Sequence, residues 1–285
     1  MDIKVLREEK SVSQVNNFFL GVVLWSVFIQ FMPINPNYYQ YIAFLIPISI
    51  YLFLNKSNIE RILKPNMLNL KSVFIIVCIW VSVLPIILLM AELYIYFFGD
   101  TLANIVSQNS HESLTINFFL IAITPAILEE LLMRGIILDG YRNKSRLVAA
   151  VMNGFMFGML HLNSFQFFHT FIAGIIASYL VYATNSIFAG MLIHTINNGL
   201  PLIIDYLYPI VPEETSIAEP NFIGLVIFAL IGLVFLIKLF RLLFKVNNIS
   251  TKENRVFSKE KIFGFPLLIS TIIFIGFSIL IILNI

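Results

Sequence analysis

The sequence predicts an all-α polytopic membrane protein, a transmembrane helical bundle of about 8–9 spans. Two observations support this fold class. Hydrophobic residues make up 59% of the 285 residues and charged residues only 12%, about half the charged fraction of a typical soluble domain. Apolar runs close to the roughly 20 residues that a membrane helix needs also recur along the whole chain. A soluble enzyme is therefore excluded, and no nucleic acid is expected among the partners.

Nine apolar runs are candidates for membrane helices, although the second, fifth and sixth are short. The connectors between them leave no room for a soluble domain, so 1–285 is expected to form a single integral membrane domain. The charged N-terminus precedes the first run without a small-residue cleavage site, which indicates an anchor and not a removed signal peptide. The runs cover about 17–34, 38–54, 72–98, 115–138, 147–162, 167–184, 187–208, 221–244 and 262–284.

The positions of the basic residues predict the orientation, because cytoplasmic loops collect Lys and Arg. With a cytosolic N-terminus and nine spans, every basic residue except Arg134 falls in an inner loop or at an inner end. The segment 209–220 is acidic instead, as suits an outer loop. The single cysteine, Cys78, excludes an intramolecular disulfide and a cysteine-only metal site.

Three charged residues interrupt the run at 115–138. Each charge at the centre of a membrane helix costs about 2.5 to 3.5 kcal/mol on insertion scales, so Glu129, Glu130 and Arg134 need partners. Glu130 and Arg134 are four residues apart, the spacing at which helix side chains meet, and they are predicted to form an ion pair. Glu129 points about 100 degrees away and is left as a carboxylate without a partner on its own helix.

Three further polar residues lie in neighbouring runs at a similar depth. His161, His194 and Asn198 fall, like Glu129, roughly 10 to 20 Å from the inner ends of their runs at about 1.5 Å per residue. The prediction is one cavity between the midplane and the cytosolic face. In it Glu129 would take a proton from water that His161 orients, while His194 and Asn198 would donate hydrogen bonds to a developing oxyanion.

Other polar and small residues of the central runs have structural interpretations. Ala150, Gly154 and Gly158 recur every four residues, the spacing that lets two membrane helices pack closely. Pro125 removes a backbone donor and is predicted to kink its helix and free a carbonyl near Ile121. The residues expected to be structural or interfacial are His111, Asn153, His169 and Asp205.

The polar residues also form three ordered motifs. Glu129-Glu130-x-x-x-Arg134, Phe157-x-x-x-His161 and His194-x-x-x-Asn198 resemble the motifs of the CPBP intramembrane proteases. That family contains the type II CAAX prenyl endopeptidases and bacteriocin-processing or immunity proteins. The resemblance spans about 115–200, within a core at 115–208. The flanking helices at 1–98 and 221–285 carry no recognised motif, so substrate choice does not follow from the family.

The resemblance implies roles for these residues. Glu129 would be the base that activates water and His161 its partner, while His194 and Asn198 would form the oxyanion site. Glu130 and Arg134 would hold the architecture. Members of the family have been described as metalloproteases, and Glu129, His161 and His194 would be the ligands of a zinc ion. No HExxH sequence occurs, and metal-free water activation without a cofactor is the favoured hypothesis.

The sequence therefore predicts a multi-pass protein of the cell membrane that acts as an endopeptidase. Its partner would be a membrane-associated peptide, a leader or a lipidated protein tail, because a deep site admits only an extended chain. Two other classes remain as alternatives. One is a non-catalytic scaffold or immunity protein of the same fold. The other is a proton-coupled transporter, although no inverted repeat is visible.

Overall fold

The computed structural model describes residues 11–106, 113–208, 221–254 and 256–283. Helices dominate these residues and no strand occurs among them, which confirms the all-α prediction. Eight helices in this part of the chain are long and apolar enough to cross a membrane. They are α2 (Ser11–Gln30), Asn37–Leu54, α6 (Leu70–Phe98), Leu114–Gly140, α12 (Ser164–Thr184), α13 (Phe188–Leu207), α14 (Phe222–Val246) and α15 (Phe265–Leu283).

Two of these spans are composite, and short helices connect the others. The span Asn37–Leu54 contains most of α3 (Pro36–Gln40), a π-helical segment and α4 (Ile46–Leu54). The span Leu114–Gly140 contains α8 (Leu114–Asn117), the π-helical η3 (Phe118–Ile123), α9 (Thr124–Glu130), the π-helical η4 (Leu131–Ile137) and α10 (Leu138–Gly140). The short connecting helices are α5 (Ile59–Leu63) and α7 (Thr101–Val106).

The fifth apolar run differs from the prediction of nine spans. It forms α11 (Arg146–Leu160), which has 15 residues and is about 22 Å long, less than the roughly 30 Å hydrocarbon core. Its Ala149 and Ala150 are fully buried. The chain leaves α11 at Leu162, which has a left-handed backbone (φ 55). This run is therefore a short internal helix, and it ends at the level of the candidate site.

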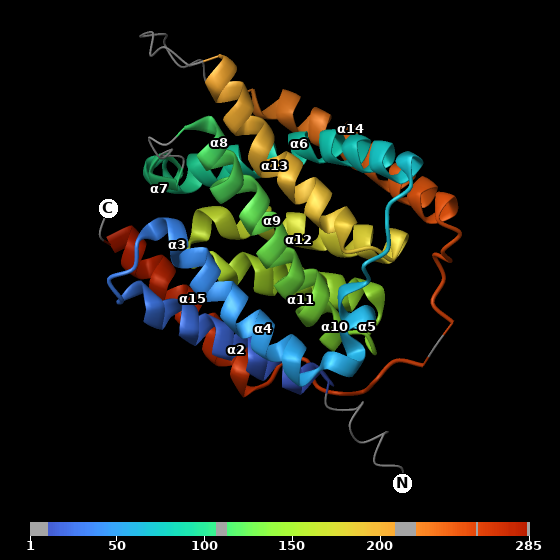
Figure 1. Cartoon of the computed structure of the whole chain (residues 1–285). Coiled ribbons are helices and arrows are strands. Elements are labelled where there is room, and N and C mark those ends of the chain that lie inside the picture. The colour runs from blue at the N-terminus through green and yellow to red at the C-terminus, as the bar shows by residue number, and fades with distance from the viewer. Residues whose placement is uncertain (1–10, 107–112, 209–220, 255, 284–285) are drawn as a thin grey trace, which may run out of the picture.

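The composite span Leu114–Gly140 lies between two groups of helices (Figure 1). On one side, one apolar cluster joins it to α2, α4 and α11. On the other side, a second apolar cluster joins α6, α12, α13 and α14. The span that carries Glu129, Glu130 and Arg134 thus has packed helices on both sides.

The predicted close packing of α11 is present, and its partner is α12. A Cβ atom on Gly154 would lie 2.5 Å from the carbonyl oxygen of Phe171, and one on Gly158 would lie 2.7 Å from the ring of Phe167. Any side chain at either glycine would therefore force the two helices apart. This packing fixes the turn between α11 and α12, where His161 lies.

The freed carbonyl predicted from Pro125 is also present. Proline has no N–H to donate to the carbonyl of Ile121, and the Asn198 side-chain Nδ2 of α13 donates to that oxygen at 3.1 Å. The π-helical turns on both sides of α9 show that the whole span departs from regular α-helix. A neighbouring helix thus satisfies the backbone group that the proline leaves open.

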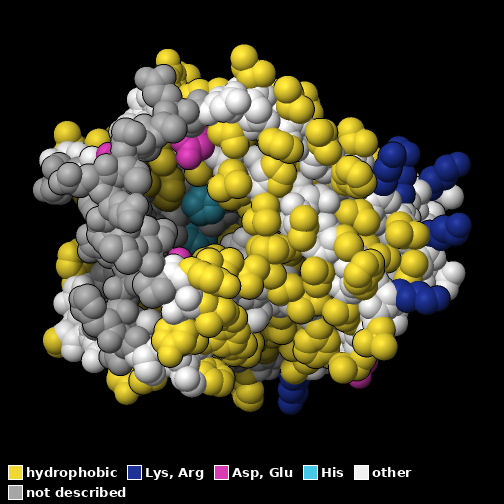
Figure 2. Space-filling view, turned by 90° about the horizontal axis from the view of Figure 1, so that it is seen from above, with side chains coloured by type: hydrophobic (Ala, Val, Ile, Leu, Met, Phe, Trp, Pro, Cys, Tyr) yellow, Lys and Arg dark blue, Asp and Glu magenta, His cyan; other side chains and the backbone are white. Residues whose placement is uncertain are grey.

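Lysine and arginine side chains gather at one end of the molecule (Figure 2). We call it the basic end; it contains the segments between α4 and α6, between α10 and α11, and between α14 and α15. There Arg61 forms an ion pair with Asp139, and Lys144 donates to the carbonyl oxygens of Ser258 and Glu260. That this end faces the cytosol remains a prediction of the positive-inside rule.

Candidate active site

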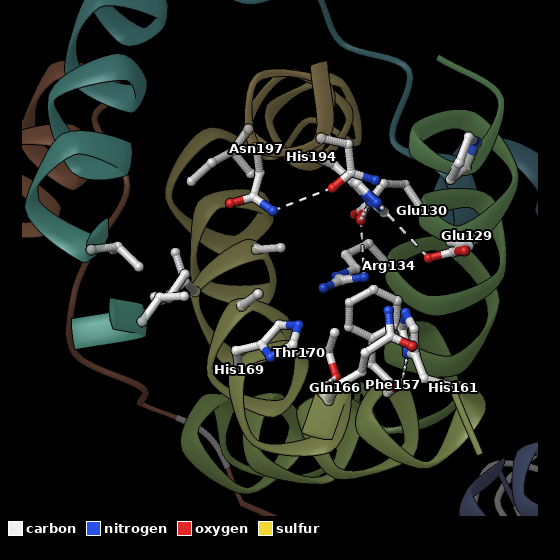
Figure 3. A pocket seen from close by; sticks show the side chains of 18 of the residues that line it. Glu129, Glu130, Arg134, Phe157, His161, Gln166, His169, Thr170, His194 and Asn197 are labelled. Atoms are coloured by element: carbon white, nitrogen blue, oxygen red, sulfur yellow. Dashed lines mark hydrogen bonds and ion pairs between the residues drawn. The ribbon is translucent and has the colours of Figure 1, made fainter. Parts of the chain in front are cut away.

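A pocket of about 330 Å³ opens between the central helices, within the size range of small-ligand sites. It is lined from the span Leu114–Gly140, α6, the turn after α11, α12 and α13. All six residues singled out in the sequence line it, although they come from three separate motifs. They are Glu129, Glu130, Arg134, His161, His194 and Asn198 (Figure 3).

Glu130 and Arg134 form the ion pair that their spacing predicts. Arg134 Nη1 lies 2.9 Å from Glu130 Oε1, and each side chain is only 1% exposed. The guanidinium also lies over the ring of Phe157, 4.4 Å from the ring centroid. Opposite charges and an aromatic face thus offset the cost of burying the cation.

His194 joins this pair to Glu129. Its Nδ1 donates to Glu130 Oε1 at 3.0 Å, and its Nε2 lies 3.9 Å from Glu129 Oε2. Glu129 is 12% exposed, against 1% for Glu130, so Glu129 is the carboxylate that reaches the open pocket. In the described part of the chain, no hydrogen bond or ion pair links Glu129 to His161; the imidazole nearest to Glu129 is that of His194.

One face of α13 makes all these contacts with the central span. Gly190, His194 and Asn198 recur every four residues and therefore lie on one side of the helix. A Cβ atom on Gly190 would collide with Glu130 Oε2, so the glycine provides the space that Glu130 occupies. Along this face, Gly190 leaves space for the Glu130 carboxylate, His194 donates a hydrogen bond to it, and Asn198 donates to a backbone carbonyl.

His161 is placed by the end of α11. It follows the last residue of that helix, and Asn163 then caps α12 by accepting a hydrogen bond from the backbone N–H of Gln166 at 2.8 Å. His161 Nδ1 lies 3.0 Å from the carbonyl oxygen of Phe157. Because a carbonyl can only accept, Nδ1 carries the proton, and Nε2 of the neutral ring is left as an acceptor.

The pocket also contains polar residues that sequence reasoning did not assign to the site. Trp80 comes from α6, while Gln166, His169 and Thr170 come from α12. His169 was expected to be structural or interfacial, and its side chain instead borders the pocket (Figure 3). The spacing i, i+3, i+4 of the three α12 residues was the available signal, because it places them on one helix face.

The remaining polar candidates lie elsewhere. Asn153 donates through Nδ2 to the carbonyl of Met133 at 2.6 Å, and its Oδ1 accepts from Ser178 at 3.1 Å, a structural role as expected. Asp205 is exposed near the end of α13. His111 lies outside the described residues.

The pocket extends from the candidate residues away from the basic end. From Glu129 its lining continues to Pro125 and Ile121, away from the basic residues that follow α10. The hollow with the histidine side chains lies towards the end opposite the Lys and Arg side chains (Figure 2). The predicted position of the cavity, between the midplane and the cytosolic face, stays a prediction.

The proposed alternative zinc ligands do not fit a metal ion as they are placed here. In the described parts of the chain, no three His, Cys, Asp or Glu side chains lie close enough together to hold one ion. Glu129, His161 and His194 therefore do not form such a group either.

Comparison with known proteins agrees with the geometry. Residues 111–200 match a family model described as "Type II CAAX prenyl endopeptidase Rce1-like". No curated protein and no solved structure gives a significant match. The matched residues contain all three motifs, and they support a membrane protease of the CAAX type. The resemblance is thereby confirmed for residues 111–200, which are similar to the CPBP family of intramembrane proteases and support membership of that family.

Proposed function

We propose that the protein is an intramembrane endopeptidase of the cell membrane. It hydrolyses a peptide bond in a membrane-associated peptide, a leader or a lipidated protein tail. One observation supports this most. Glu129 reaches the pocket, lies beside His194 and shares the pocket with His161. A carboxylate and an acceptor imidazole facing one cavity are the groups that water activation requires.

The reaction follows from the placement of these groups. Water bound in the pocket gives a proton to Glu129 while the His161 Nε2 accepts its second hydrogen bond. The water oxygen forms a bond to the carbonyl carbon, and the electron pair of the C=O bond moves to oxygen. The carbon–nitrogen bond then breaks, and the leaving amine takes the proton from Glu129.

The substrate class is supported by the surroundings of the site. The pocket lies among membrane-crossing helices, and only part of Glu129 and of His194 is exposed. A folded domain cannot enter such a site, whereas an extended peptide can. The peptide would enter from the half of the molecule away from the basic end, where the pocket opens.

Three substitutions test the mechanism. Glu129→Gln, His161→Ala and His194→Ala should each lower cleavage at least about 100-fold, the scale of a lost general base, while the protein still accumulates in membranes. The matched control is Glu92→Gln, because Glu92 is also within a membrane helix but does not line the pocket. Peptides released by cells that express each variant are compared by mass spectrometry.

The outcomes separate the competing functions. Full cleavage by Glu129→Gln contradicts the mechanism. The protease proposal fails if cells with the wild-type protein and cells without it release the same peptides. A phenotype that survives all three substitutions indicates a scaffold or immunity protein, and proton-dependent solute uptake by reconstituted protein indicates a transporter.

The proposal also predicts that cleavage does not depend on zinc. Incubation of the purified protein with a tight zinc chelator should leave the rate unchanged within about twofold, because the pocket supplies its own base. The control adds zinc back after dialysis. Loss of activity with the chelator, and its return with zinc but not with magnesium, would contradict the metal-free mechanism.

A further inference from the structure

A second pocket lies at the basic end, on another face of α12 from the candidate active site. It has a volume of about 380 Å³, and its walls come from the start of α11, from α12, from α14 and from the segment that follows α14. Of the residues that line it, only Ile176 also lines the candidate active site. This second pocket, which we call the α14 groove, is therefore a separate site.

The α14 groove is largely apolar and opens at the surface of membrane-crossing helices. Both α12 and α14 are long and apolar enough to cross a membrane. Ile176 and Leu236 are buried in the groove, whereas Ile237 is 47% exposed and Leu147 is 59% exposed along it. In a bilayer such a surface is in contact with hydrocarbon, so the groove fits a lipid chain.

Two arginines line the groove where it reaches the basic end. Arg146 is the first residue of α11. Arg241 lies five residues before Val246, the last residue of α14, which is a distance of about 8 Å at 1.5 Å per residue. Both arginines are thus close to helix ends, where long basic side chains reach the head groups of the lipids.

The charges of these arginines are available to a ligand. Arg146 Nη1 donates to the carbonyl oxygen of Ser250 at 2.6 Å, and the guanidinium lies 5.3 Å from the centroid of the Phe244 ring; these contacts position the cation without neutralising it. Arg241 is exposed and has no hydrogen bond or ion pair within the described part of the chain. Glu253 also lines the groove, and its carboxylate accepts from the backbone N–H of Arg146 at 3.0 Å. Two arginines against one glutamate leave the groove with a net positive charge.

We propose that the α14 groove binds an anionic phospholipid. One acyl chain lies along Ile175 and Ile237, and the phosphate accepts hydrogen bonds from Arg146 and Arg241. Guanidinium groups suit this role because they can donate two parallel hydrogen bonds to a phosphate, and basic pockets between membrane helices are typical sites for anionic head groups. The inference does not depend on the proposed function, since Glu129 does not line this groove.

The test titrates purified full-length protein in detergent with dioleoyl phosphatidylglycerol, which is anionic, or with dioleoyl phosphatidylcholine, which is zwitterionic. Native mass spectrometry counts the bound lipids and the copies of the chain. The first phosphatidylglycerol should bind at least about fivefold more tightly than the first phosphatidylcholine, the factor that one basic residue supplies near a membrane. Arg241→Gln and Arg146→Gln should each lower the affinity for phosphatidylglycerol by about fivefold and leave that for phosphatidylcholine nearly unchanged.

Matched controls separate the groove from its surroundings. Lys56→Gln removes the same charge from the basic end, and Lys56 is exposed but does not line the groove, so phosphatidylglycerol should bind as it does to the wild-type protein. Ile237→Trp fills the groove and should abolish the tight binding of phosphatidylglycerol. Ile231→Trp should keep that binding, because Ile231 is 46% exposed on the same helix and lies outside the groove.

Three results would overturn the proposal. The first is equal affinity of the wild-type protein for the two lipids. The second is an equal loss of phosphatidylglycerol binding in Lys56→Gln and Arg241→Gln, which indicates a general effect of surface charge. The third is a dimer of the wild-type chain that Ile237→Trp dissociates, because the groove would then be an interface between two copies.

Discussion

At the scale of single residues, the adjacent carboxylates Glu129 and Glu130 have different surroundings. Glu130 is enclosed by Arg134, by His194 and by the space at Gly190, whereas Glu129 reaches the pocket. The two residues are consecutive in the sequence, but their side chains point to different sides of the helix. One carboxylate can therefore stabilise a buried cation while the other exchanges protons with water.

The space at Gly190 gives a prediction for stability. In Gly190→Ala the added methyl group would collide with Glu130 Oε2 and should displace the carboxylate from Arg134. We expect the free energy of unfolding to fall by about 1–3 kcal/mol, as for other overpacked sites, and cleavage to fall with it. Denaturation of the purified protein in detergent measures the change.

The matched control for this substitution is Gly276→Ala. Gly276 lies within α15, and a Cβ atom there would meet nothing within 4 Å. Its stability should equal or slightly exceed that of the wild-type protein, since alanine favours helix over glycine. If Gly190→Ala is as stable as Gly276→Ala, the packing of Glu130 against α13 is not as described.

At the scale of helices, Pro125 and Asn198 are predicted to be coupled. Asn198→Ala leaves the Ile121 carbonyl without its donor, and an unsatisfied buried group costs about 1–3 kcal/mol. In a Pro125→Ala background, the new backbone N–H at position 125 can take over that carbonyl. The loss of Asn198 should then cost at least about 0.5 kcal/mol less, a coupling typical of residues that share a partner.

A double-mutant cycle measures this coupling. The unfolding free energies of the wild-type protein, the two single variants and the double variant are compared in the same detergent. The control pair is Pro125→Ala with Asn153→Ala, because Asn153 serves the carbonyl of Met133 instead. Equal costs of Asn198→Ala with and without the proline would contradict the shared role.

The same helices show how much the sequence could reveal. The ion pair of Glu130 and Arg134 followed from spacing on one helix, and the open carbonyl of Ile121 followed from Pro125. Both are local consequences of helix geometry. That Asn198 serves this carbonyl, and that His194 donates to Glu130 more closely than it approaches Glu129, depends on how α13 is rotated against its neighbour. One sequence does not specify that rotation.

At the scale of the whole molecule, the length of α11 was the main difference from prediction. Hydropathy detects apolar residues but does not tell a membrane helix from a short helix enclosed by others, and α11 is the second kind. The depth of a side chain along its helix likewise does not tell towards which end the cavity opens. The lining of the pocket has to be seen in the folded molecule, where it continues from Glu129 to Pro125 and Ile121.

The orientation of the molecule is the last prediction, and it decides from which side a substrate arrives. The positive-inside rule places the basic end in the cytosol, so the pocket would open towards the opposite face of the membrane.

Cysteine labelling in a Cys78→Ser background tests this orientation. Ser57→Cys lies beside the basic residues, and Asn35→Cys lies between α2 and α3, at the other end. Both positions are exposed. A thiol reagent that does not cross membranes should label Asn35→Cys in intact cells and Ser57→Cys only after the cells are opened. The control labels both variants in detergent to equal extents. The reverse pattern would place the basic end outside and turn the pocket to the cytosol, where a lipidated tail made in the cytosol could enter directly.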